Sequence, residues 1–180
     1  MEKWYQNHLD ELKLKIIKEF QYLFENFKNQ KIYAVAINAD NNSVTSYTAI
    51  STLESLKKQH NKRKWLPRKW IFTVADGIYA DDYLDEFTKK ILNFYGDNIL
   101  PKIQAGSIRE QEIENNINFY IQAIKQAKLE LINQFGSLIN DIVFVLTVDE
   151  QPKITLRSVL EVNDPSIFLQ EFVDLLKLEP

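Results

Sequence analysis

Apolar side chains recur every three or four residues over much of this chain, which predicts several amphipathic helices. Such stripes cover residues 5–27, 84–94, 108–135 and 168–176. Gly136 directly follows the third stripe and is of the residue type that most often ends a helix, since glycine adopts left-handed backbone angles without a steric cost. We therefore expect four main helices, each of which buries one face.

Short and almost continuously apolar runs predict strands between these helices. Residues 32–37 and 142–148 are apolar enough to be buried on both faces of a sheet. The β-rich run 44–50 follows the first of them after a short stretch of Asp and Asn, so we expect the two to form an antiparallel hairpin. Residues 70–74 predict a further strand, and residues 154–162 predict an edge strand.

The order of these elements predicts the fold class. Helices and strands do not alternate strictly, so we expect an α+β fold with a mostly antiparallel sheet of four to five strands and long helices packed mainly on one face. The whole chain, residues 1–180, has a length typical of a single domain. Ser51, with Glu54 three residues later, has capping-box spacing and predicts that a helix begins directly after the hairpin.

Composition excludes several classes of protein. The chain is 45% hydrophobic with only 4 Gly and 5 Pro, which excludes collagen-like and wholly disordered chains. It has no Cys, so we expect neither disulfides nor thiolate chemistry. The polar amino terminus lacks a secretory signal, and no apolar run approaches the ~20 residues that cross a bilayer. We therefore expect a cytoplasmic protein without membrane contact.

Charge is unevenly distributed along the chain. Seven of the 22 basic residues lie within residues 57–69, which contain no acid, so the rest of the chain holds 15 basic against 25 acidic residues. A positive patch on an acidic body favours an acidic protein partner, and Trp65 and Trp70 also admit stacking on single-stranded nucleic acid. A solvated basic loop with structural tryptophans is the plainer interpretation, and the acidic remainder makes nucleic acid the least favoured partner. The candidate partner-binding residues are Lys62, Arg63, Lys64, Trp65, Arg68 and Lys69.

Candidate catalytic and metal-binding residues are few. Two His, no Cys and no Gly-x-Ser-x-Gly elbow predict no nucleophilic triad, and four Gly predict no phosphate-binding loop. The acids within residues 76–86 lack the spacing of a calcium loop and fit the start of a helix. We therefore expect neither a metal nor a cofactor. An alternative carboxylate site would combine Asp76, Asp81, Asp82 and Asp149.

Four short segments resemble a bacterial family of unknown function, the domain-of-unknown-function family 4303. They are residues 32–37, residues 48–54, the Trp-x-Pro-x-x-Trp segment within 64–70, and residues 145–150 with the turn at 162–165. The resemblance spans about residues 5–175, although Leu66 and Lys69 stand where the family usually has Ser and an acid. Small proteins of this kind occur near bacterial toxin systems, and the resemblance implies an immunity role, that of a toxin-neutralising protein.

The Trp-x-Pro-x-x-Trp segment also has a physical interpretation of its own. Pro67 disfavours helical backbone at Leu66, so the chain is expected to be extended or turning there. Trp65 and Trp70 are large enough to anchor such a turn on the sheet.

Together these patterns predict a protein-binding domain without catalytic activity, whose partner is another protein. Two alternatives stay open. One is a small-ligand-binding protein or hydrolase that uses the carboxylate site, and the other is a binder of single-stranded nucleic acid through residues 57–69.

Overall fold

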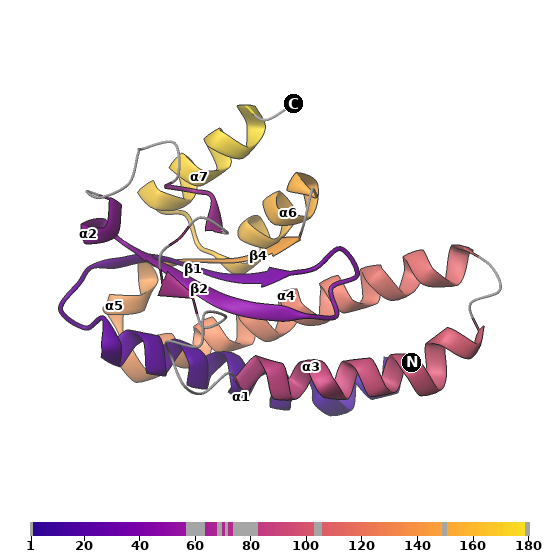
Figure 1. The fold of residues 1–180 in the computed structure, drawn as a ribbon. Helices are drawn as coiled ribbons and strands as arrows, with labels where there is room; N and C mark the ends of the chain where they lie inside the picture. Colours follow the sequence, from indigo (N-terminus) through magenta and orange to yellow (C-terminus); the bar gives the residue numbers. More distant parts are fainter. Residues whose placement is uncertain are drawn as a thin grey trace.

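A central sheet lies between two layers of helices (Figure 1). The computed structural model describes residues 2–56, 64–67, 70, 72–73, 83–102, 106–148 and 151–178. One face of the sheet is covered by α1 (Glu2–Asn26), α3 (Tyr83–Phe94) and α4 (Gly106–Phe135), and the other by α6 (Pro152–Val162) and α7 (Ile167–Leu178). The short helical elements are α2 (Leu53–Leu56), η3 (Tyr95–Ile99), η4 (Leu100–Lys102) and α5 (Ser137–Asn140).

The sheet has three full strands and one very short one. Their bounds are β1 (Ile32–Ala39), β2 (Ser46–Thr52), β3 (Phe72–Thr73) and β4 (Val143–Val148), in the order β3-β2-β1-β4. The hairpin pair β1 and β2 is antiparallel, as predicted, and the two-residue β3 extends it beside β2. In contrast, β1 and β4 are parallel, with Val35 opposite Phe144.

The predicted sheet of four to five mostly antiparallel strands, with helices mainly on one face, is therefore wrong. The sheet is mixed, has only three full strands and carries helices on both faces. Every residue of β1 and β4 is buried, which is the pattern of parallel strands covered on both faces. The segments between the hairpin and β4, which include α3 and α4, form the long crossover that a parallel pair requires.

The predicted edge strand at residues 154–162 is also wrong, because this segment is α6. Its buried residues are Thr155, Ser158, Val159 and Val162, which recur at the three- and four-residue spacing of one helix face. The β-branched residues in the segment favour a strand locally, but burial of this face against β4 decides the outcome. Pro152 occupies the first turn of the helix, where a missing N–H costs nothing.

The predicted helices at residues 5–27, 84–94, 108–135 and 168–176 are confirmed as α1, α3, α4 and α7. Gly136 has a φ of 63°, so the helix-ending role expected of it is confirmed as well. At the start of α2 the cap is Thr52 rather than Ser51, since the Ser55 N–H donates to Thr52 Oγ1 at 3.0 Å. Among the described residues, no helix combines the length and apolarity that spanning a bilayer requires.

Candidate functional site

Most of the site residues predicted from the sequence lie outside the described residues. They are Lys62, Arg63, Arg68, Lys69, Asp76, Asp81, Asp82 and Asp149. Only Lys64 and Trp65 of the predicted site residues fall within the described part of the chain.

Lys64 and Trp65 both contact residues of α7. Trp65 is 4% exposed and stacks on Phe172 of α7, with ring centroids 4.7 Å apart. Lys64 Nζ lies 2.5 Å from Glu171 Oε2 and 5.6 Å from the centroid of the Tyr33 ring. These contacts are made within the chain, so the described part of the basic stretch does not present these two side chains to a partner.

Trp70 completes the same anchor, because its indole Nε1 donates to the Lys64 carbonyl at 3.0 Å. Tyr33 OH donates to this carbonyl as well, at 2.8 Å. The prediction that Trp65 and Trp70 anchor the turn on the sheet is confirmed, since both indoles lie in the core that α6 and α7 cover.

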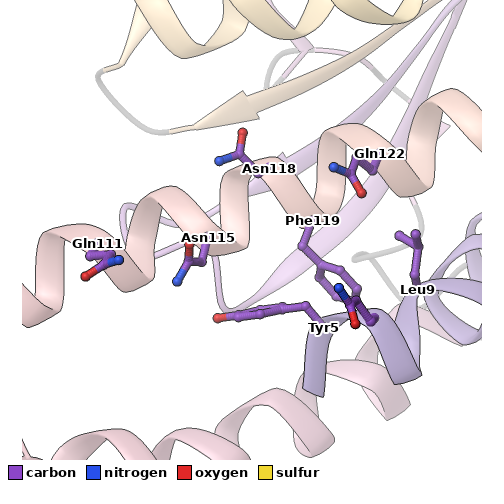
Figure 2. A pocket seen from close by; sticks show the side chains of 8 residues that line it. Tyr5, Leu9, Gln111, Asn115, Asn118, Phe119 and Gln122 are labelled. Carbon is purple, nitrogen blue, oxygen red and sulfur yellow. The ribbon is translucent and has the colours of Figure 1, made fainter. Parts of the chain in front are cut away.

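A groove of about 430 Å³ lies between the start of α1 and the first half of α4 (Figure 2). Its lining consists of Tyr5, Gln6 and Leu9 from α1 and Gln111, Asn115, Asn118, Phe119 and Gln122 from α4. Five of these eight side chains are carboxamides, and Tyr5 is the only titratable one. The described lining is therefore electrically neutral but rich in hydrogen-bond donors and acceptors.

Four of the five lining residues on α4 are carboxamides, and they form a stripe along the helix. Gln111, Asn115, Asn118 and Gln122 are spaced by four, three and four residues, which places them on one side of a helix. Asn118 is engaged with α6, because its Oδ1 accepts a hydrogen bond from Arg157. Gln111 and Gln122 are exposed at the mouth, so their amides can hydrogen-bond to a bound molecule.

A buried polar cluster lies directly behind this stripe. Glu112 and Asn116 are both 0% exposed, although each is a polar residue on the core side of α4. Tyr5 OH lies 3.1 Å from Glu112 Oε2 and 2.9 Å from Asn116 Oδ1. Asn116 Nδ2 donates to Tyr95 OH at 2.7 Å, and Asn115 Nδ2 donates to Glu112 Oε1 at 3.2 Å. The cluster thus connects the groove wall to η3 at the end of α3.

The two tyrosines of this cluster remain protonated at neutral pH. Burial is the main reason why their pKa values are raised above the usual value for tyrosine, and the charge of Glu112 acts in the same direction. The pKa of Tyr95 is raised to about 12, and that of Tyr5 is raised further. Tyr5 is therefore a hydrogen-bond donor, with one proton for two acceptors, Glu112 and Asn116. The described residues form no ion pair with Glu112.

Two further pockets lie elsewhere on the surface. One of about 410 Å³ is bordered by the β1–β2 turn, with Asp40, and by Tyr95 and Arg109. The other, of about 240 Å³, contains Lys128 and Asn163 beside the end of α6. Within the described ranges, no three or more His, Cys, Asp or Glu side chains gather in a way that could hold a metal ion.

Sequence reasoning missed the groove and the cluster. In the sequence, the groove is indicated only by the spacing of the carboxamides in α4. The cluster is indicated only by Glu112 and Asn116, which are four residues apart and adjacent to the apolar residues Ile113 and Ile117. The other wall depends on Tyr5, which is separated from Glu112 by 107 residues along the chain. A helix-by-helix interpretation of the sequence cannot bring these residues together.

Comparisons with known proteins provide no relative from which a function of the groove could be inferred. No family model, curated protein or solved structure matches the chain. The resemblance to family 4303 therefore stays a prediction.

Proposed function

We propose that this chain is a protein-binding domain without catalytic activity, and that it holds a segment of its partner in the groove between α1 and α4. The observation that carries the proposal is the set of exposed carboxamides in the lining, which are Gln6, Gln111 and Gln122. The amides of Asn115 and Asn118 already form hydrogen bonds within the chain. A carboxamide presents a donor and an acceptor together, as a peptide group does, so a row of them can pair with the backbone of an extended segment.

The apolar part of the lining supports the same function. Tyr5, Leu9 and Phe119 lie beside the carboxamides and offer aromatic and aliphatic surface to the side chains of a bound segment. The volume of about 430 Å³ lies within the range of ligand pockets, so it accommodates a few side chains rather than a whole element. These groups bind and orient a partner, and the one titratable group among them, Tyr5, has a raised pKa and stays protonated.

The immunity role is a narrower form of this proposal, in which the partner is a bacterial toxin. It rests on the resemblance to family 4303 alone and adds no residue to the groove.

Selection from a library of random short peptides on the immobilised chain tests the groove. We expect the selected peptides to lose roughly tenfold or more in affinity for Gln122→Trp, since an indole at this position fills the groove. Asn133→Trp is the matched control, because Asn133 is exposed on α4 roughly three turns further along and does not line the groove. If no peptide is selected, or if both variants bind the peptides as the original chain does, the proposal is wrong.

A further inference from the structure

Glu112 is a buried carboxylate whose charge is poorly compensated within the described structure. It is 0% exposed, and its hydrogen bonds come from Tyr5 OH at 3.1 Å and Asn115 Nδ2 at 3.2 Å. The Tyr5 proton is shared, because Asn116 Oδ1 lies closer to the same hydroxyl, at 2.9 Å. An ionised carboxylate removed from water is costly unless a cation or several strong donors face it.

Only one layer of side chains separates this carboxylate from the groove. Tyr5 and Asn115 both contact Glu112, and both line the groove. Figure 2 shows the Tyr5 hydroxyl pointing along the groove toward the side where Asn115 and Gln111 lie. A group bound at this end is therefore next to the two side chains that form the hydrogen bonds of Glu112.

The same end of the groove favours a cation over an anion. Because Asn115 Nδ2 is engaged with Glu112, the Oδ1 of the same amide is left as an acceptor. None of the described lining residues is basic, and Arg157, which contacts the lining residue Asn118, is itself paired with Glu114 and Glu161.

We propose that the bound partner segment places a lysine or arginine side chain at the Tyr5–Asn115 end of the groove, where its charge is balanced by Glu112. This inference rests on the proposed function and specifies the chemistry of the partner. It also explains why an otherwise neutral groove has a carboxylate buried behind its wall.

A double-mutant cycle on a selected peptide tests this inference. The peptide with the highest affinity is compared with a copy in which its lysine or arginine is replaced by norleucine or citrulline, on the original chain and on Glu112→Gln. We expect each change alone to reduce affinity roughly tenfold or more, and both together to cost little more than one. Glu110→Gln is the control, since Glu110 is exposed on the same helix and is not among the described lining residues of the groove.

The outcomes separate the two proposals. If the selected peptides carry no basic residue, or if Glu112→Gln binds the basic and neutral copies as the original chain does, the inference is wrong while the groove remains the binding site. Binding of the basic and the neutral peptide to the original chain measures the effect of the peptide's charge. This comparison does not depend on how well Glu112→Gln folds. If Gln122→Trp leaves peptide binding intact, the proposed function fails, and the inference fails with it.

Discussion

The side-chain amide of Asn163 forms both of the hydrogen bonds that the Phe144 backbone directs away from the sheet. Its Nδ2 donates to the Phe144 carbonyl at 2.7 Å, and its Oδ1 accepts from the Phe144 N–H at 2.8 Å. Further along β4, the Leu146 N–H donates to Ser158 Oγ at 2.7 Å. Because β4 is the last strand in the sheet order, its outer backbone groups could pair with a strand of another chain. The side chains of Asn163 and Ser158 form hydrogen bonds with these groups instead.

Asn163→Ala is expected to destabilise the chain by roughly 2–4 kcal/mol, since it leaves the N–H and the carbonyl of Phe144 without their partner. We also expect the variant to self-associate through the exposed edge of β4. Urea unfolding measures the first effect and sedimentation velocity the second. Asn140→Ala, at an exposed position, is the control and should change neither. Equal stability of the two variants would contradict this role of Asn163.

The edge of β4 also shows how far the sequence could predict the fold. The sequence predicts that segment 154–162 pairs with the sheet as a strand. Instead the segment lies within α6, and the side chains of Ser158 in this helix and of Asn163 directly after it form hydrogen bonds that a strand backbone would otherwise form with β4. Helix positions such as those of α4 were predictable because their apolar spacing is local. The parallel pairing of β1 and β4 was not, because it depends on how the long crossover packs.

Trp65→Ala is expected to cost roughly 3–5 kcal/mol, because it removes a buried indole that stacks on Phe172. Lys64→Met should cost less than Trp65→Ala, roughly 1–2 kcal/mol, since it keeps the apolar stem and loses a partly exposed pair with Glu171 and the packing of the ammonium group near three aromatic rings. Thermal unfolding followed by near-UV circular dichroism compares the two. Should Trp65→Ala prove as stable as Lys64→Met, the indole does not anchor this turn.

Lys128 gives the stability of the chain a specific pH dependence. Burial lowers its pKa to about 8, although nearby Asp164 and Asp141 act in the opposite direction. Between about pH 8 and 10.4 the unfolded chain binds more protons at this residue than the folded chain, so the Lys128 contribution to stability rises with pH in that window. The destabilising cost is fully present below about pH 8.

Lys128→Met is therefore expected to be more stable than the original chain near neutral pH, by an amount that shrinks by roughly 2–3 kcal/mol as the pH rises to about 10. Phe144 N–H continues to satisfy Asn163 Oδ1 in the variant. Urea unfolding at several pH values measures the difference. Lys125→Met, one turn earlier and exposed, should show no such trend. A difference that stays constant with pH would refute the assignment to Lys128.

Tyr5→Phe is expected to cost roughly 1–3 kcal/mol, since it removes a hydroxyl donor from the buried carboxylate of Glu112. The cost should be smaller in a Glu112→Gln background, because a neutral amide depends less on that donor. Unfolding free energies of the two single variants and the double variant give the coupling. Strict additivity would mean that the Tyr5 hydroxyl does not stabilise Glu112.

The groove itself illustrates why the candidate site was not predictable. Its carboxamides carry no charge and match no catalytic or metal-binding spacing. They could therefore not be recognised as site residues from the sequence. The basic stretch at residues 57–69 is the most uneven feature of the sequence, yet its described residues Lys64 and Trp65 pack against the chain itself. What identifies the groove is the approach of Tyr5 to α4, which only the fold provides.

Mapping a selected peptide onto the nitrogen-labelled chain by NMR tests the groove as the binding surface most directly. We predict that the largest backbone shifts on saturation occur at Gln6, Asn115 and Gln122, on the two walls between α1 and α4. Shifts that leave these positions unchanged and gather instead around residues 64–67 and α7 would contradict the account.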